Sequence, residues 1–504
     1  MSPVRSAPAP FPVAVIDIGS NSGRVVVLER DRAGHLRLLT GSRAPLRLVH
    51  DVDEQHSLSE ESMARTMEAL RDFHAIAAGV GARRILAVAT AAMRDARNGG
   101  LFMDRIRREL RIRVEIIDGQ EEARYGFAGA VRGLPVSSGV LFDLGGGSMQ
   151  VSHFKARRLT RATSLPLGAL RLSEKFLASD PPRAKEIRRL RDHVLKHLKK
   201  AAVGPLGRPE SLIGTGGTLR NLAKIDRNAH RYPISRLHGY TLTLERLHGI
   251  VRRIAATRQK DRDGISGLSA ERADSIVGGA VAIETLMEIV RAREILVSSQ
   301  GVREGIALRL LKMTVAATKD VKEASLGSLV SRFDGWHAEA STRRRALAAA
   351  LLRALEPRAD PKITEALDHS ARVLDVGRSF DFVDRHEHAA DILLTTELNG
   401  FTHEELALAS VLVRRAGDRH ADPKQLGTLI VLSDRGQLER GAVILELADE
   451  IEARCPHGHP IAVKCEVGRD VKISVPLLPS WRASDLGQRF ERAFRKPLIV
   501  RTGG

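Results

Sequence analysis

The chain contains the same short pattern twice, and this repeat constrains the fold more than any other feature of the sequence. Each copy, residues 15–28 and 141–154, is an apolar run that ends in an aspartate. Glycine and hydroxyl residues follow, and then a second run rich in β-forming residues. This order predicts a strand, a tight turn and a returning strand. Glycines let a backbone approach a ligand closely, and successive N–H groups in such a turn form an anion-binding concavity. Two copies therefore predict two facing lobes that hold one phosphate-rich ligand between them.

The residues that carry chemistry in these copies stand at the two turns. The first turn contributes Asp17, Gly19, Ser20, Asn21 and Ser22, and the second contributes Asp143, Gly145, Gly146, Gly147 and Ser148. An aspartate at the end of each strand can hold a divalent cation or a water beside a bound phosphate. A third phosphate-type turn follows a short apolar run and consists of Gly214, Thr215, Gly216, Gly217 and Thr218. Arg94 ends a segment that follows another expected strand, where its guanidinium can bond two phosphate oxygens.

The charge of the chain agrees with an anionic ligand but does not identify it. With 80 Lys and Arg against 61 Asp and Glu, the formal net charge is +19, which suits nucleic acid, polyphosphate or an anionic membrane. A coding bias toward arginine would give the same charge. Aromatic residues make up only 4% of the chain, which argues against single-stranded nucleic acid, because that ligand is usually bound by aromatic stacking. Nucleic acid is therefore not expected as the main ligand.

Cysteine content and hydropathy bear on where the protein works. Two cysteines in 504 residues indicate a reducing compartment and no disulfide framework. The sequence has no run of 18 apolar residues, so no membrane-spanning helix is expected. The proline-rich residues 1–11 lack the apolar region of a signal peptide, and we expect them to form a disordered tail. These features predict a cytoplasmic protein with no membrane partner.

The remaining patterns divide the chain into three larger parts. Residues 12–135 and 136–312 each combine a hairpin with short apolar strands and helices, which predicts an α/β architecture of two lobes. In the first lobe we expect one long helix over residues 91–110. From about residue 320 to 504, segments rich in Ala, Leu and Arg at helical spacing predict an all-helical domain. Two strands near residues 462–475 predict a small α/β piece at its end.

Seven motifs in a fixed order give the chain a family resemblance. Besides the two hairpins they are the segments 90–94, 119–124, 214–218, 269–280 and 301–305. Together they resemble the exopolyphosphatase / guanosine pentaphosphate phosphohydrolase (Ppx/GppA) family over residues 12–312. The resemblance implies two actin-like lobes of the ribonuclease H-like superfamily that holds actin, sugar kinases and heat-shock ATPases, with a phosphate-binding cleft between them. It extends more weakly to a C-terminal helical domain like the HD phosphohydrolases. A homodimer is the expected assembly.

The resemblance also implies roles for single residues. Glu122, the second carboxylate of the Glu-Glu-Ala-Arg segment 121–124, takes the position of the family's catalytic base. A carboxylate there can take a proton from the water that attacks a phosphoanhydride. Asp143 matches the carboxylate that the family associates with Mg²⁺, so Mg²⁺ is the expected cofactor. The family usually has a glutamate two residues after the cradle serine, and this chain has Gln150. Because an amide lacks charge, we expect a metal site of Asp143 and Gln150 with weakened affinity.

Four functions remain open at this point. The first is an exopolyphosphatase that releases orthophosphate from the ends of inorganic polyphosphate, which the net charge favours over a compact nucleotide. The second is a guanosine pentaphosphate 5′-phosphohydrolase that acts on pppGpp with the same site. A kinase of the same superfamily is disfavoured by the Glu-Glu-Ala-Arg segment and by the absence of a Walker lysine pattern. The fourth is a non-catalytic sensor of polyphosphate or alarmone, and the presence of Gln150 in place of glutamate is its only support.

Two weaker signals lie outside these motifs. Cys455, His457, His459 and Cys465 match no standard zinc-finger spacing, so packed thiols are the favoured interpretation. The basic helix expected over residues 183–200 is most simply a solvated face, and guidance of a polyanion toward the cleft is the alternative.

The helical part carries residues that resemble an incomplete metal site. His386, His388 and Asp391 stand where HD enzymes keep metal ligands. The first His-Asp pair of that fold is Leu374-Asp375 here, so the ligand set is incomplete. We therefore expect no second hydrolase site.

Overall fold

The computed structural model describes residues 11–48, 56–417, 426–476, 478, 481 and 484–502. The expected N-terminal tail lies outside these residues except for Phe11. The chain forms two compact units. The first contains residues 1–232 and 236–324, and the second contains residues 233–235 and 325–504. Among the described helices, none is long and apolar enough to cross a membrane.

The first lobe is a five-stranded sheet with the order β3-β2-β1-β4-β5. Its strands are rich in Val, Ile, Leu and Ala, and they are β1 (Val13–Ile18), β2 (Ser22–Arg30), β3 (Leu36–Pro45), β4 (Arg84–Ala89) and β5 (Val114–Ile116). The predicted hairpin is confirmed, because β1 pairs with β2 antiparallel. One face of the sheet is covered by the helices α2 (Glu60–Gly79), α3 (Ala91–Asp95) and α4 (Gly99–Leu110). A buried core that includes Phe73, Phe102 and Ile16 lies between them.

The second lobe repeats this arrangement in a six-stranded sheet, β10-β11-β9-β6-β7-β8. The strands are β6 (Gly139–Leu144), β7 (Met149–Lys155), β8 (Arg158–Leu165), β9 (Ser211–Thr215), β10 (Thr241–Thr243) and β11 (Glu294–Val297). The second hairpin, β6 with β7, is also antiparallel. In each sheet a further strand then pairs parallel to the first strand of the hairpin, β4 to β1 and β9 to β6. Two lobes of one topology are therefore built around the two copies of the sequence pattern.

Helices bury one face of the second sheet. They are α6 (Ala169–Phe176), α7 (Ala184–Lys200), α8 (Gly217–Ala229), α9 (Leu244–Ala256) and α10 (Ile276–Ile289). Short 3₁₀ turns, η1 (Gln259–Gly264) and η2 (Ala270–Arg272), connect α9 to α10. The helix α10 is mostly apolar and almost entirely buried, which is the pattern of a helix at the centre of a core.

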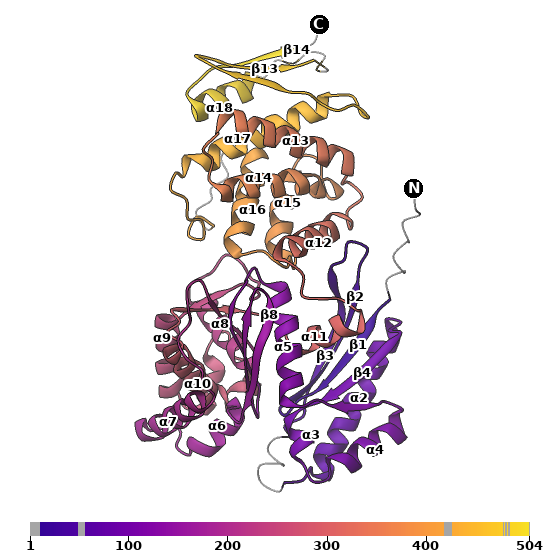
Figure 1. Cartoon of the computed structure of the whole chain (residues 1–504), viewed down its shortest axis with the longest axis vertical. Coiled ribbons are helices and arrows are strands. Elements are labelled where there is room, and N and C mark those ends of the chain that lie inside the picture. Colours follow the sequence, from indigo (N-terminus) through magenta and orange to yellow (C-terminus); the bar gives the residue numbers. More distant parts are fainter. Residues whose placement is uncertain are drawn as a thin grey trace. The chain divides into compact units, whose positions relative to one another are not determined.

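Two helices pack on each other between the lobes, α5 (Gly119–Gly133) and α11 (Val302–Leu310) (Figure 1). Their backbones approach so closely at Gly129 and Gly305 that a Cβ at either glycine would overlap backbone atoms of the other helix or its start. Only glycine permits this packing distance. The close packing fixes the first residues of both helices, which matter below.

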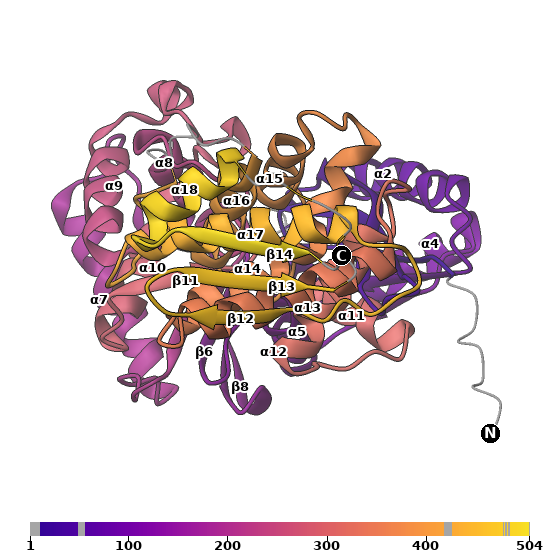
Figure 2. The same ribbon diagram turned by 90° about the horizontal axis from the view of Figure 1, so that it is seen from above.

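The second unit is mainly helical, with a small sheet at its end. Its helices are α12 (Thr318–Val330, which begins in the first unit), α13 (Ala338–Leu355), α14 (Pro361–Val373), η3 (Leu374–Ser379), α15 (Arg385–Thr395), α16 (His403–Gly417), α17 (Gly436–Arg454) and α18 (Ser484–Phe494). The sheet consists of β12 (Lys464–Val467), β13 (Val471–Val475) and β14 (Leu498–Thr502), which lie side by side in Figure 2. A single buried apolar cluster joins these helices and strands.

A buried network of charges crosses the centre of the helical unit. Arg344 is 0% exposed and donates to Asp449 and Asp375, at 2.7 Å each. Arg385 donates a second bond to Asp449 at 2.5 Å. The acidic residue of the Leu374-Asp375 pair is therefore bound by a guanidinium. Arginine side chains bind the carboxylates here. In the described part of this unit, no three His, Cys, Asp or Glu side chains bring their ligand atoms close enough together to form a metal site.

Two local expectations need correction, and a third, the basic helix, is confirmed. The helix expected over 91–110 is broken at residues 96–98, because the Asn98 side chain turns back to bond the backbone of Leu58. The expectations also missed α17 and β14. The basic helix over 183–200 exists as α7 and buries Leu190, Val194 and Leu198, so its basic residues lie on the other faces.

Candidate active site

Both predicted turns line one pocket of the first unit. The lining includes every residue that was singled out at the two hairpins: Asp17, Gly19, Ser20, Asn21, Ser22, Asp143, Gly145, Gly146, Gly147 and Ser148. From the third turn, Thr215, Gly216 and Gly217 reach the pocket. The structure thus brings together segments that are far apart in the sequence.

The two hairpin turns have the same backbone geometry. The N–H of Gly19 donates to the carbonyl of Ser22 at 3.2 Å, and the N–H of Gly145 donates to the carbonyl of Ser148 at 2.9 Å. The turns also approach each other, because a Cβ at Gly146 would be 3.2 Å from the Cβ of Asn21. Backbone groups of both lobes therefore face a common space, the arrangement expected of two phosphate cradles.

Four other predicted residues do not line the pocket directly. Gly214 packs against Phe142, and Thr218 is fully buried beside Gly279. Arg94 donates to the carbonyl of Ile117 at 3.2 Å and lies 3.4 Å from the carboxylate of Asp95. Gly214, Thr218 and Arg94 therefore pack behind the residues that line the pocket. The fourth, Gln150, is buried behind the second turn.

Capping of α5 separates the roles of two adjacent carboxylates. Asp118 accepts from the backbone N–H groups of Gln120 and Glu121 at 2.8 Å each, and Glu121 accepts from the N–H of Asp118 at 3.2 Å. This reciprocal capping box occupies Glu121. Glu122, the next residue, lines the pocket instead.

Gln150 contacts Glu122 directly. Its Nε2 donates to Oε2 of Glu122 at 2.9 Å and to Oγ of Ser148 at 2.8 Å. Gln150 is the register partner of Asp143 across the hairpin, which puts it next to the strand end that carries that aspartate. The amide therefore fixes the orientation of the Glu122 carboxylate in the free protein.

Three carboxylates of the pocket hold their protons more tightly than usual. Burial, followed by the charges of Asp143 and Asp17, raises the pKa of Glu122 to about 8. Burial raises the pKa of Asp143 to about 6, although Arg220 opposes the shift, and it raises the pKa of Asp17 against the opposing charges of Arg303 and Arg24. Like charges that meet in a buried site favour protonation or a bound cation. The oxygen donors suit Mg²⁺, which prefers carboxylates and phosphate oxygens.

Four arginines of the pocket were not singled out from the sequence. They are Arg24, Arg220, Arg272 and Arg303. Burial, with the charges of Arg220, Arg303 and Arg43, lowers the pKa of Arg24 to about 8, and burial with Arg303 lowers the pKa of Arg220 to about 10. Guanidinium groups that destabilise one another in this way need an anion. One signal was available for Arg24, because the hairpin pairs it with Asp17.

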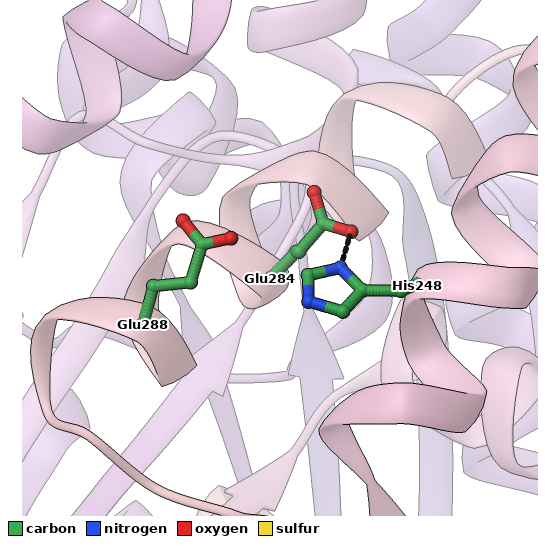
Figure 3. Close-up of side chains that lie close together, drawn as sticks. All are labelled: His248, Glu284 and Glu288. Carbon is green, nitrogen blue, oxygen red and sulfur yellow. Dashed lines mark hydrogen bonds and ion pairs between the residues drawn. The ribbon is translucent and has the colours of Figure 1, made fainter.

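A second acidic group lies away from the pocket (Figure 3). Within the described residues, it is the one group of His, Cys, Asp and Glu whose ligand atoms all lie within 4.8 Å, and it comprises His248, Glu284 and Glu288. His248 contacts Glu284 at 2.5 Å, and Arg191 bonds Glu284 and also Glu288, the latter at 2.8 Å. Arg191 already neutralises both carboxylates, so this group is an ion-pair network. Among the residues that the structure describes, Cys455 and Cys465 also do not belong to any group with the ligand spacing of a metal site.

Comparison with known proteins identifies the family. The family model described as Ppx/GppA phosphatase family matches residues 26–314. Exopolyphosphatase 1 of Mycobacterium tuberculosis is 30% identical over 337 residues, which cover 66% of this chain and 98% of that protein. A protein of Photobacterium profundum named guanosine-5′-triphosphate,3′-diphosphate pyrophosphatase is 27% identical over 416 residues, 80% of each chain.

Solved structures agree with this result. The Ppx/GppA family member of Aquifex aeolicus is 29% identical, with a TM-score of 0.54, over 60% of this chain and 98% of its own. An exopolyphosphatase from Cytophaga hutchinsonii is 26% identical, with a TM-score of 0.56, over 60% of this chain and 99% of its own. The predicted fold class, two actin-like lobes with a helical C-terminal region, is thereby confirmed. The chain belongs to the Ppx/GppA phosphatase family.

Proposed function

We propose that this protein is an exopolyphosphatase that hydrolyses the terminal phosphoanhydride bond of inorganic polyphosphate and releases orthophosphate. The observation that carries the proposal is the composition of the pocket. Four arginines and the backbone of three glycine-rich turns line it, and its described lining contains no aromatic side chain. Leu144 and Val302 are its apolar contributions. Such a wall recognises phosphate groups, and its described lining offers no aromatic ring on which a nucleobase could stack.

The chemistry divides among the residues in an ordered way. The terminal phosphate binds the N–H groups of the two turns, with Ser20 and Ser148 beside them. Glu122 takes a proton from the attacking water. Arg220 and Arg303 meet the negative charge that spreads over the phosphoryl oxygens in the transition state. Gln150 orients Glu122 for this role through the bond at 2.9 Å.

A divalent cation fits the same pocket. Asp17 and Asp143 would hold Mg²⁺, because they are the two carboxylates at the strand ends and their pKa values are both raised in its absence. Bound Mg²⁺ would supply positive charge beside the phosphate and would favour the ionised forms of Asp17, Asp143 and Glu122. Glu122 could then accept a proton near neutral pH.

One observation favours a second candidate function. The Photobacterium profundum protein, whose name specifies guanosine pentaphosphate chemistry, aligns over 80% of this chain and therefore into the helical unit. Hydrolysis of the 5′-terminal phosphate of pppGpp would use the same carboxylates and arginines. The two activities differ in what holds the rest of the substrate.

A single substitution tests the proposed mechanism. Glu122→Gln should lower the rate of orthophosphate release from polyphosphate by a factor on the order of 10² to 10⁴, because the base is lost while the cradles remain. Polyphosphate binding, measured by calorimetry, should persist. Glu121→Gln is the matched control, since Glu121 only caps α5, and its activity should stay within about two-fold of the wild type. Full activity in Glu122→Gln would exclude this residue as the base.

A further inference from the structure

The arginines of the pocket form a row that continues beyond the lining to Arg43. Arg43 on β3 is the register partner of Arg24 on β2, so the two guanidinium groups start from adjacent strand positions. Arg272 lies against the start of α8, where a Cβ at Gly217 would overlap its guanidinium. The pKa of Arg272 is lowered by burial and then by Arg43, and that of Arg24 by burial and by Arg220, Arg303 and Arg43. These mutual effects show that five guanidinium groups lie within electrostatic reach of one another.

Two ion pairs join the lobes at the outer end of this row. Nη2 of Arg43 lies 2.5 Å from Oε2 of Glu271, and Nη2 of Arg47 lies 3.9 Å from Oδ2 of Asp274. Both arginines belong to the first lobe, on β3 or just after it, and both acids belong to the second lobe, at η2 and just after it. The pairs therefore link the two lobes in the neighbourhood of Arg272, on which Arg43, Glu271 and Asp274 all act electrostatically.

These pairs are incompletely satisfied. Nε of Arg43 and Oδ1 of Asp274 are buried and have no hydrogen-bond partner among the described residues. Buried polar atoms are nearly always paired in native proteins, so an unpaired donor and an unpaired acceptor at one edge need an explanation. Partly exposed ion pairs also contribute little to stability, which leaves them easy to exchange for another partner.

We propose that Arg43 and Arg47 are the outer phosphate subsites of the pocket and that Glu271 and Asp274 occupy them until a chain of phosphates arrives. This inference rests on the proposed function for its substrate class. A phosphate group matches the guanidinium fork as a carboxylate does and carries the same charge, and a polymer brings several such groups in a row. A chain long enough to reach the edge displaces the two acids, whereas a short chain that fills only the inner pocket leaves both pairs intact. Arg43, Arg47, Glu271 and Asp274 are therefore chain-length determinants.

The test compares long-chain polyphosphate with tripolyphosphate in the full-length protein. Arg43→Gln should raise the KM for the long chain roughly tenfold and reduce the dependence of log KM on log salt concentration by about 0.7 to 0.9, the value of one lost phosphate contact. Its kcat, and its KM for tripolyphosphate, should stay within about two-fold of the wild type. Glu271→Gln removes the competing carboxylate and should lower the KM for the long chain roughly three-fold.

A matched control separates subsite loss from a general charge effect. Glu288→Gln removes one negative charge from the same lobe at the ion pair with Arg191, outside the pocket, and should change neither KM. If Arg43→Gln and Glu271→Gln alter both substrates equally, the pairs only hold the lobes together and the proposal is overturned. It is also overturned if neither variant alters the long-chain KM. If the wild type releases no orthophosphate from either substrate, the proposed function fails instead, and the same shifts must then be sought in the Kd for long-chain polyphosphate.

Discussion

Buried arginines meet buried carboxylates in the pocket of the first unit and again in the centre of the helical unit, with opposite electrostatic results. In the pocket, the pKa of Arg24 falls to about 8 and that of Glu122 rises to about 8, so both charged forms are disfavoured. In the helical unit, burial alone would lower the pKa of Arg344, but Asp449 and Asp375 raise it above its ordinary value. The pKa of Asp449 is correspondingly lowered, because Arg344 and Arg385 outweigh the effect of its burial.

This difference separates a site that awaits a ligand from a network that holds a fold. Charges in the helical unit find their partners within the protein, as close as 2.5 Å between Arg385 and Asp449. In the pocket, the pKa values of Arg24 and Arg220 stay lowered and those of Glu122 and Asp143 stay raised, so neighbouring protein groups do not fully compensate these charges. Polyphosphate and Mg²⁺ would supply the two missing partners. Pre-organised charges of this kind cost stability, a cost that natural active sites commonly carry.

The largest expected contrast is in stability. Arg344→Met should lower the free energy of unfolding of the helical unit by about 3–5 kcal/mol, because it removes one guanidinium partner from each of two buried carboxylates. Arg24→Met in the pocket should leave the free energy of unfolding unchanged or raise it by roughly 1 kcal/mol, because it removes a guanidinium that its neighbours repel. Urea unfolding monitored by circular dichroism measures both. A destabilised Arg24→Met protein would mean that the pocket arginines are structural.

The two regions should also respond to pH in opposite directions. Without bound cation, Glu122 and Asp143 keep protons up to about pH 8 and 6, whereas their unfolded values are 4.5 and 3.8. The folded state therefore holds more protons in this window, and the free energy of unfolding should fall as the pH rises from about 4 to 8. Asp449 has a lowered pKa, so its contribution is present above its unfolded value of 3.8 and is lost as the pH falls below it.

Unfolding experiments across this pH range in EDTA would measure the effect. Glu122→Gln should flatten the decline toward pH 8, since it removes the carboxyl group whose pKa is raised to about 8. Added Mg²⁺ should flatten it as well. A wild-type stability that rises steadily from about pH 5 to 8 would contradict the raised pKa values in the pocket.

The smallest expected effect concerns Gln150. Gln150→Glu adds a fourth carboxylate to the three of the pocket, next to Glu122, and should lower the Mg²⁺ concentration for half-maximal activity by roughly three- to ten-fold. Mg²⁺ affinity measured by calorimetry should change in the same direction. Gln150→Met removes the amide without adding charge and serves as the control. Unchanged Mg²⁺ affinity in Gln150→Glu would mean that position 150 is not near the cation.

The turns of the pocket could be predicted from the sequence because their information is local. Each strand, aspartate and glycine turn lies within about ten residues, and the structure forms both hairpins as expected. The break at residues 96–98 also had a local signal, since Asn98 is followed by two glycines. The capping box of Asp118 and Glu121 also had a local signal, because the two residues are three positions apart at the start of a helix. This signal separates Glu121, which caps the helix, from Glu122, which faces the pocket.

The arginines of the pocket could not be predicted in the same way. Three of them lie on different elements: Arg220 in the first turn of α8, Arg272 at the end of η2 and Arg303 at the start of α11. They meet only because the second sheet and the packing of α5 on α11 bring these elements together. Ion pairs between lobes, such as Arg43 with Glu271, join residues more than 200 positions apart in the chain. Sequence spacing carries no information on such contacts. Of the three arginines on α8, η2 and α11, the family resemblance indicated only the segments that contain Arg272 and Arg303.

The most direct test of the account is the ratio of kcat/KM for long-chain polyphosphate to that for pppGpp, measured as orthophosphate release by the wild-type protein in Mg²⁺. The arginine-lined pocket without an aromatic wall predicts a ratio above about ten, because each added phosphate contact favours the polymer. The ratio should fall toward one as salt concentration rises. A ratio below one at low salt would contradict the account and identify the protein as a guanosine pentaphosphate phosphohydrolase.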